Sequence, residues 1–288
     1  MLNESVTRTR SMDPIDPVNP VDPVDPVETG EVLDHGGQWS PVKSADRALG
    51  ILEALARHSP LSLGELSTQL GIPKSSLHGI VRTMEQRGWV EADSGRSSYR
   101  LGLRCLVVGA GYVDGDLTVG RTAPLLDELA AATSETVHLG RLEGREVVYM
   151  AKRESVHPLR MFSAVGRRLP AHATALGKAM LACRSDDAVA SSFPPTLDPI
   201  TPNTIRSRAE LIARLAEVRE TGIAVDNEEA TVGLRCFAVA LPFREPSVDA
   251  ISVSIPVARL DATVEAHVVG MLRLAVAQLA RARPADER

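Results

Sequence analysis

Residues 62–86 read SLGELSTQLGIPKSSLHGIVRTMEQ and hold two short amphipathic segments, separated by glycine and proline. Ser62 followed by Glu65 is a capping-box signature that opens a helix, and Gly71 suits the left-handed residue that ends one. Pro73 has the fixed φ of a first helical position. Apolar residues then recur at i, i+3, i+4 and i+7, which is the pattern of one buried helix face, at Leu77, Ile80, Val81 and Met84. We therefore predict two helices joined by a tight turn.

The surrounding block, residues 41–104, predicts a third helix and a hairpin. Ser44 can cap a helix that runs to about Arg57. WVEADSGRSSYRLG (89–102) holds two short extended runs around Asp93-Ser94-Gly95, which is typical of a hairpin. Helix, helix, tight turn, helix and hairpin follow one another in the order of a winged helix-turn-helix domain.

The charge of the chain points to the same block. The 288 residues carry a net charge of −5, but residues 1–40 carry −6, residues 41–104 carry +3 and the remainder carries −2. A winged helix places the second helix of its motif in the major groove, where polar side chains meet phosphates and base edges. A small helical subdomain with a solvated polar face is the alternative. The candidate DNA contacts are Lys43, Arg47, Lys74, Ser75, Ser76, His78, Gly79, Arg82, and the wing residues Arg96 and Arg100, which we expect on one face of their strand.

The first 40 residues contain a proline-rich repeat. DPIDPVNPVDPVDPV places proline at every third position from 14 to 26, which excludes a helix or a central strand and favours extended polyproline II. We expect a disordered spacer, with a docking arm as the alternative.

Several classes of protein are disfavoured by composition. No apolar run approaches the ~18 residues of a membrane span, and the N-terminus lacks the apolar core of a signal peptide. Cys105, Cys183 and Cys236 are far apart and odd in number, so neither a disulfide framework nor a zinc finger is expected. We expect a reduced, cytoplasmic protein without cofactor or metal and without a membrane partner.

The rest of the chain predicts an α+β domain built on an antiparallel sheet. Glycine-rich residues 105–120 are interpreted as a partly helical linker, between the winged-helix domain at 41–104 and a second domain at 121–284. Helices are expected at 122–133, 173–182, 206–222 and about 258–282. Strands are expected at 137–142, 146–153, 159–164, 223–226, 234–241 and 250–255.

Two segments of this second domain indicate an anion site. His172, Thr174 and Ala175 lead into a helix, whose first amides and positive dipole end favour a carboxylate or phosphate. In DAISVSIP, Ser252 and Ser254 share one face of a strand and face either a pocket or solvent. Lys178 is a possible anion partner or a solvated helix residue.

Motifs in both halves resemble the isocitrate lyase regulator (IclR) family of bacterial transcription factors over about residues 41–282. They are VKSADRALGILEAL, LGELSTQLGIPKSSLHGIVRTMEQRGWVE, YRLG, RLPAHATALGKAMLA and GIAVDNEEATVGLRCFAVAL. The resemblance implies a C-terminal GAF-like effector domain that binds small organic acids or aromatic carboxylates. Many members carry arginine where Gly79 stands, and the HGIV form is similar to the glycerol-operon-type regulators of actinobacteria.

The resemblance also places Asp226 and Cys236 beside the ligand and Met161 in the apolar pocket wall. A small core residue is the other interpretation of Cys236, and zinc held by Cys236 and a nearby histidine is a minor alternative. The predicted effector site comprises Met161, His172, Thr174, Ala175, Asp226, Cys236, Ser252 and Ser254.

We therefore expect a DNA-binding transcriptional regulator, a repressor, whose operator binding is modulated by an organic acid or a related carbon-source metabolite. Its expected partners are double-stranded operator DNA, the small-molecule effector and further copies of itself, as a homodimer or a dimer of dimers. The alternative is a small-molecule-binding enzyme with an accessory helical domain. The chain holds no GxSxG, HExxH or phosphate-binding glycine loop, so no catalytic residue is assigned.

Overall fold

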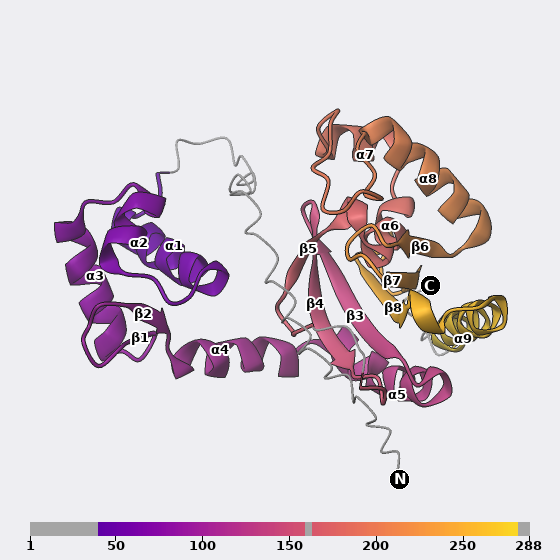
Figure 1. The fold of residues 1–288 in the computed structure, drawn as a ribbon, viewed down its shortest axis with the longest axis horizontal. Coiled ribbons are helices and arrows are strands. Elements are labelled where there is room, and N and C mark those ends of the chain that lie inside the picture. Colours follow the sequence, from indigo (N-terminus) through magenta and orange to yellow (C-terminus); the bar gives the residue numbers. More distant parts are fainter. Residues whose placement is uncertain (1–39, 159–162, 282–288) are drawn as a thin grey trace, which may run out of the picture. The chain divides into compact units, whose positions relative to one another are not determined.

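The computed structural model describes residues 40–158 and 163–281. Its first five elements are three helices and a two-stranded antiparallel hairpin (Figure 1). They are α1 (Lys43–Arg57), α2 (Leu63–Leu70), α3 (Lys74–Gln86), β1 (Val90–Ala92) and β2 (Tyr99–Leu101). Ile51, Leu66 and Leu77, one from each helix, are fully buried in their common core. The predicted winged helix-turn-helix fold is confirmed.

The predicted N-cap and C-cap of α2 are both present in the structure. The Ser62 hydroxyl accepts a hydrogen bond from the Glu65 amide at 3.2 Å, and the Ser62 amide donates to the Glu65 carboxylate at 2.7 Å. Gly71 follows α2 with φ of 61°, a left-handed conformation that glycine adopts without steric cost. The capping box therefore begins α2, and Gly71 ends it.

Two predicted helix starts are wrong by one or two residues. α1 begins at Lys43 after Val42, so Ser44 lies inside the helix and caps nothing. Pro73 has an extended ψ of 137° and precedes α3 as its N-cap residue instead of opening the helix. Its carbonyl oxygen still accepts from the Ser76 and Leu77 amides, because the residue before a helix shares in the first turn of bonding.

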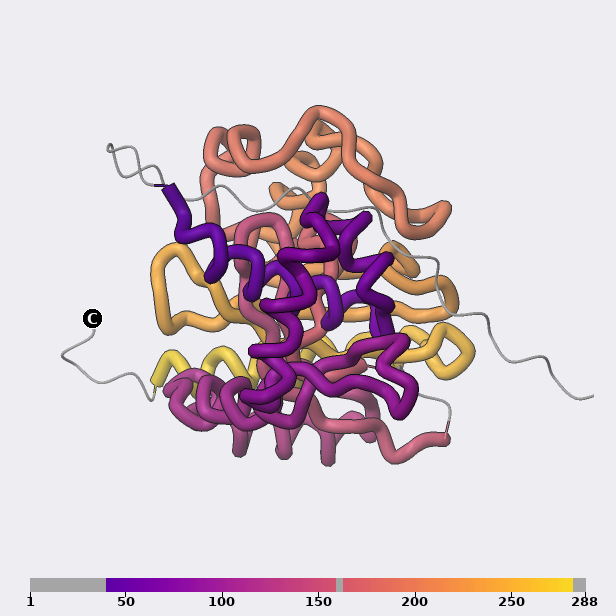
Figure 2. Tube along the Cα trace, turned by 90° about the vertical axis from the view of Figure 1, so that its left-hand side faces the viewer, coloured from indigo at the N-terminus to yellow at the C-terminus, as the bar shows by residue number. Residues whose placement is uncertain are grey.

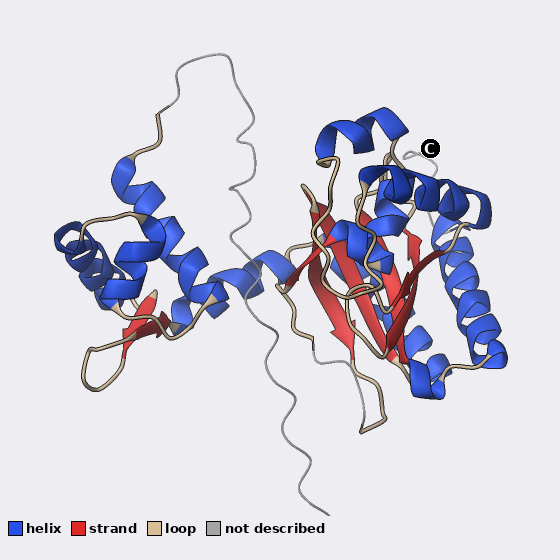
Figure 3. Cartoon of the chain, turned by 45° about the horizontal axis from the view of Figure 1, so that its top comes forward, coloured by secondary structure: helices blue, strands red, loops and turns tan. Residues whose placement is uncertain are grey.

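The second domain is a six-stranded sheet with helices on both faces (Figure 3). All pairings in the sheet are antiparallel, in the order β5-β4-β3-β8-β7-β6, which confirms the predicted α+β class. The strands are β3 (Thr136–Glu143), β4 (Glu146–Arg153), β5 (Arg168–Pro170), β6 (Ala224–Asn227), β7 (Leu234–Ala240) and β8 (Asp249–Pro256). The helices beside them are α5 (Leu117–Thr133), α6 (Ala175–Ala182) and α9 (Ala262–Arg281).

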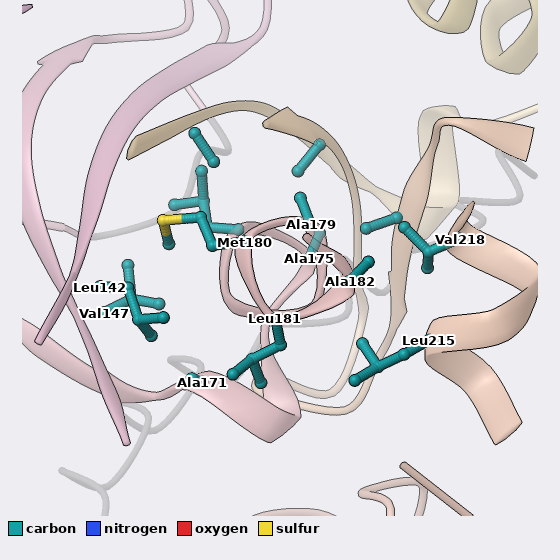
Figure 4. Close-up of a cluster of buried hydrophobic side chains, with 14 of the residues drawn as sticks. Leu142, Val147, Ala171, Ala175, Ala179, Met180, Leu181, Ala182, Leu215 and Val218 are labelled. Atoms are coloured by element: carbon teal, nitrogen blue, oxygen red, sulfur yellow. The ribbon is translucent and has the colours of Figure 1, made fainter. Parts of the chain in front are cut away.

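Each face of the sheet has its own apolar core. On one face, α5 and α9 lie side by side and pack on Val137, Phe237 and Val253 (Figure 2). On the other face lies α6, with α7 (Asp186–Ser192) and α8 (Arg208–Thr221) beyond it. Figure 4 shows α6 in the middle of this second cluster, between Val147 of the sheet and Leu215 of α8. Both faces of the central strands are therefore shielded from water.

The predicted linker is helical through most of its length. α4 spans Leu103–Asp114, and α5 begins at Leu117, five residues earlier than expected. The Asp116 side chain accepts from the Thr118 and Val119 amides and so caps α5. No residue of α4 is buried, which leaves its apolar side chains exposed.

A few predicted elements differ from the structure. The strand expected at 159–164 falls largely on 159–162, outside the described residues, and 163–164 belong to no strand. The short strand β5, the helix α7 and the 3-10 turns η1 (Ala171–Ala173) and η2 (Val257–Arg259) were not predicted. Each has seven residues or fewer, too short for a periodic apolar pattern.

Gly177 of α6 lies where a side chain has no room. A Cβ there would be 2.1 Å from the Ala171 carbonyl oxygen, which is backbone and cannot move aside. We expect Gly177→Ala to lower the free energy of unfolding by about 3 kcal/mol through overpacking, as measured by urea denaturation. Gly270→Ala in α9 is the matched control: its Cβ meets nothing within 4 Å, so it should stabilise by about 0.5–1 kcal/mol. Equal stabilities of the two variants would contradict this packing.

Candidate functional site

α3 presents a polar face that the fold does not use. Lys74, Ser75, His78 and Arg82 are exposed, and Ser76 is half-buried. Among the described residues, none forms a hydrogen bond or an ion pair with the Arg82 guanidinium or the His78 ring. The opposite face buries Leu77, Val81 and Met84. A stripe of unpaired donors on the second helix of the motif is available to an external acceptor.

Gly79 lies in the middle of that stripe, and its neighbours impose no need for glycine. An added Cβ would meet nothing within 4 Å, and the backbone is helical. The Thr83 hydroxyl donates to the Gly79 carbonyl oxygen at 2.9 Å. Glycine inside a helix costs about 1 kcal/mol relative to alanine, so folding alone does not account for it.

The other predicted DNA-contacting residues lie on α1 and on the wing. Lys43 is exposed and Arg47 is half-buried on the first turns of α1. Arg100 on β2 contacts the Glu91 carboxylate at 2.9 Å, and Arg96 pairs with Glu85. The expectation that both arginines share a strand face is wrong, because Arg96 lies in the turn with φ of 51°. Exposed ion pairs contribute about 0–1 kcal/mol, so a phosphate can compete for either guanidinium.

The second candidate site is a small cavity between α6 and the polar face of the sheet. Its volume is about 10 Å³, room for roughly one water molecule. Six of the eight predicted effector residues meet there, namely Thr174, Ala175, Asp226, Cys236, Ser252 and Ser254. The remaining lining residues are Tyr149, Leu169, Leu176, Ala230, Thr231 and Leu234.

The polar lining comes from neighbouring strands. Cys236 of β7 lies opposite Ser254 of β8, and its thiol donates to the Ser254 hydroxyl at 3.3 Å. Burial raises the pKa of Cys236 well above its usual value, so the thiol stays protonated. The Ser252 and Tyr149 hydroxyls have no hydrogen-bond partner within the described part of the chain. Both side chains are buried, so the interpretation that the serines face solvent is wrong.

Thr174 positions the start of α6 at the cavity. Its hydroxyl accepts from the Gly177 amide at 3.0 Å and caps the helix. The residues that follow, Ala175 and Leu176, line the cavity with the first turn of the helix. That turn carries the positive end of the helix dipole.

Asp226 brings a carboxylate into the same space. It is 3% exposed, and its Oδ1 accepts from the Glu229 amide at 2.7 Å and the Ala230 amide at 3.3 Å. Burial is the main cause that raises the pKa of Asp226 to about 6, although the nearby Lys178 ammonium and the two amides act in the opposite direction. The carboxyl group therefore changes its charge near neutral pH.

Lys178 is buried in α6. The interpretation that it is a solvated helix residue is therefore wrong. Its side chain is fully buried and forms an ion pair with Glu229 Oε1, leaving Glu229 Oε2 without a partner in the described structure. Burial lowers the pKa of Lys178, while the Glu229 carboxylate acts to raise it. The ammonium is thus occupied within the protein.

Two predicted effector residues do not line the cavity. The His172 ring bonds to the Asp198 carbonyl oxygen at 3.1 Å and meets the edge of Phe193, away from the lining residues. His172 follows Pro170 in a 3-10 turn, which aims its side chain at that loop. Met161 lies outside the described residues.

Tyr149 was missed, and so was its neighbour His138. The rings of Tyr149 and His138 stack with centroids 4.4 Å apart, and His138 Nε2 lies 2.7 Å from the Ser163 hydroxyl. Burial lowers the pKa of His138 to about 3, so the imidazole is neutral. Alternation in EVVYMAKR places Val147 and Tyr149 on one strand face, but it does not say which residues face them.

Nowhere in 40–158 and 163–281 do three or more His, Cys, Asp or Glu side chains form a group that could hold a metal ion. No helix in the same ranges is long and apolar enough to cross a bilayer.

Comparisons with known proteins match both halves of the chain. The IclR helix-turn-helix domain matches residues 44–94, and the C-terminal domain of the bacterial transcriptional regulator IclR matches residues 112–281. The regulator XynR of Escherichia coli K12 is 36% identical over 247 residues, which cover 84% of this chain and 97% of XynR. The repressor IclR of the same strain is 32% identical over 225 residues, which cover 76% of this chain and 82% of that repressor.

A solved structure supports the same conclusion. The IclR-type regulator of Alicyclobacillus acidocaldarius superposes with a TM-score of 0.75 at 26% identity, covering 84% of this chain and 99% of that one. The relatives are transcriptional regulators, which decides against the enzyme alternative. The actinobacterial subgroup stays a prediction. With both domains matched in order and across most of its length, the chain belongs to the IclR family of DNA-binding transcriptional regulators.

Proposed function

We propose that the protein is a repressor that reads its operator with α3 and responds to a small organic acid bound at the cavity. The observation that carries the first half is the polar face of α3, exposed and without intramolecular partners around Arg82 and His78. Relatives named as repressors, such as IclR and AllR of Escherichia coli, support repression as the outcome. A protein that acts on operator DNA works in the cytoplasm.

The contact set on DNA follows from the groove geometry. The first turns of the second motif helix are nearest the bases, which assigns Lys74, Ser75 and Ser76 to that region. His78 and Arg82 follow one and two turns later on the same stripe. Lys43, Arg47 and the wing residues Arg96 and Arg100 would contact phosphates on either side.

We expect Arg82→Ala to weaken operator binding by about 1–3 kcal/mol, the value of a good arginine contact with guanine. The melting temperature should not change, because Arg82 is exposed and its guanidinium bonds to no group in the described part of the chain. Gel shift on the DNA upstream of the protein's own gene measures the affinity. Arg214→Ala, an exposed arginine of α8, is the control. Wild-type affinity in Arg82→Ala would remove this residue from the interface.

The cavity supports the effector half of the proposal. The hydroxyls of Ser252 and Tyr149 have no hydrogen-bond partner among the described residues, and they line the cavity beside the first turn of α6, where a polar ligand could bond to them. Room for one water means that any larger ligand must displace the lining. A ligand that binds one arrangement of the protein better than another shifts operator occupancy by that difference in affinity.

Removing both hydroxyls of β8 tests this site. Ser252→Ala with Ser254→Ala should abolish the rise in melting temperature that a panel of small carboxylic acids gives in the wild type, because the ligand loses two hydrogen bonds. Ser192→Ala, on exposed α7, should respond as the wild type does. A double variant with an undiminished thermal shift would place the effector elsewhere.

A homodimer is supported by α4. Leu103, Leu106 and Val107 share one face of this helix and are each at least 65% exposed. Monomers rarely expose contiguous apolar patches, which mark association sites. A second copy packed on this face would set two α3 helices on the two half-sites of a pseudo-palindromic operator. A dimer of dimers would use the effector domains as its further interface.

Placing a charge on this face tests the dimer. Leu106→Glu should shift the protein from dimer to monomer in sedimentation velocity and lower operator affinity, because a buried carboxylate without a partner is costly. Val257→Glu, an exposed apolar residue of η2, is the control. A Leu106→Glu protein that remains dimeric would exclude this face as the interface.

A further inference from the structure

The cavity holds a carboxylate but no available cation. Asp226 lines it, and the lining contains no lysine, arginine or histidine among the described residues. The nearest ammonium, that of Lys178, is already paired with Glu229 Oε1. The charged groups that act on Asp226 are the Glu229 carboxyl and the Lys178 ammonium, while the Arg167 guanidinium acts on Tyr149.

Asp226 is held in place by backbone amides. Its Oδ1 accepts from Glu229 and Ala230, which fixes the carboxyl group at the cavity wall. Burial raises its pKa to about 6. The titratable groups packed around it are Lys178 of α6, Glu229 of the loop after β6, Cys236 of β7 and Tyr149 of β4, with His172 of η1 beside Lys178 and Glu229.

Asp226, with a pKa raised to about 6 by burial, can exchange a proton near neutral pH. Burial raises the pKa of Cys236 and of Tyr149, so both stay protonated, and it lowers the pKa of His172, which stays neutral. The Lys178 ammonium is committed to Glu229.

The hydrogen-bond donors in the same space favour an anion. Ser252 and Tyr149 offer hydroxyls without partners, and α6 offers its first turn. A ligand carboxylate held by these donors would lie beside Asp226, and two carboxylates that share a buried site cannot both stay ionised. One proton shared between them removes the conflict.

We propose that the cavity binds a small carboxylic acid together with one proton, held between the ligand carboxylate and Asp226. The proton comes from solvent on binding and returns to it on release. This inference rests on the proposed effector function and adds the charge state of the complex. A neutral polyol, whose hydroxyl would donate to the charged Asp226, requires no proton.

Calorimetry of the full-length wild type tests the coupling. Acetate, lactate, benzoate and glycerol are titrated between about pH 6 and pH 8, at each pH in two phosphate-free buffers that cover this range and differ in ionisation enthalpy. Above the pKa of Asp226 we expect the affinity for the acid that binds to fall about tenfold per pH unit, because protonated Asp226 becomes that much rarer. The two buffers should report uptake of up to one proton per site. Affinity independent of pH, without proton uptake, would overturn the proposal.

Asp226→Asn is the matched variant. Its amide oxygen can still accept from Glu229 and Ala230, and its NH₂ group donates to a carboxylate without a proton. At about pH 8 it should bind the acid roughly 100-fold more tightly than the wild type, with no further dependence on pH. Asp187→Asn, an exposed carboxylate of α7, should keep the wild-type profile.

The remaining outcomes separate this inference from the proposed function. Persistent proton uptake in Asp226→Asn would assign the proton to another group and overturn the inference alone. Binding of glycerol but of no acid would overturn it in favour of a neutral ligand. Binding of no compound by either protein would overturn the effector function and this inference together. If Asp226→Asn does not fold, as judged by circular dichroism, the wild-type buffer comparison decides.

Discussion

The effector domain depends on a strand that is buried on both faces. β8 is covered by α9 on one side and by α6 on the other, and every residue from Asp249 to Pro256 is buried. Side chains alternate along a strand, so Ile251 and Val253 pack in the apolar core beneath α9. Ser252 and Ser254 must therefore lie on the opposite face of the sheet, where they line the cavity beside α6. Hydroxyls in such a place need partners, and within 40–158 and 163–281 the Ser254 hydroxyl has one, the Cys236 thiol, while the Ser252 hydroxyl has none.

The same burial explains the ion pair beneath the cavity. A lysine with no exposed surface is costly unless it is paired, and Glu229 supplies the charge. Removing either partner would leave an uncompensated charge, which costs about 3–5 kcal/mol. The pair also keeps the ammonium away from any ligand, and this is what leaves Asp226 to set the electrostatics of the site. Structure and ligand chemistry are therefore linked through one buried helix, α6.

Local signals predicted most of the fold. The capping box at Ser62, the left-handed Gly71 and the apolar spacing of α3 depend on neighbours within a few residues, so the sequence shows them directly. Strand alternation predicted that Ser252 and Ser254 share a face, and the family resemblance placed Asp226 and Cys236 beside the same ligand. Tyr149 and the Lys178–Glu229 pair could not be predicted, because they depend on strand order and on contacts between residues 51 positions apart. Arg96 was misplaced for a different reason: the turn extends beyond Asp93-Ser94-Gly95, because the amide and hydroxyl of Ser97 both donate to the Asp93 carboxylate.

Gly79 shows how a structure can separate folding from function. A glycine that the fold requires is recognised by a positive φ or by a neighbour that excludes a Cβ, as the Ala171 carbonyl does at Gly177. Gly79 has neither, and glycine inside a helix lowers the stability of that helix. The hydrogen bond from the Thr83 hydroxyl goes to the Gly79 carbonyl oxygen, which any residue would supply, so this bond does not require glycine. Its position between His78 and Arg82 on the exposed face leaves an external partner as the reason. If α3 enters the major groove, a missing side chain lets the helix backbone approach the bases more closely than an arginine would, so the operator read by this helix should differ from those of relatives with arginine.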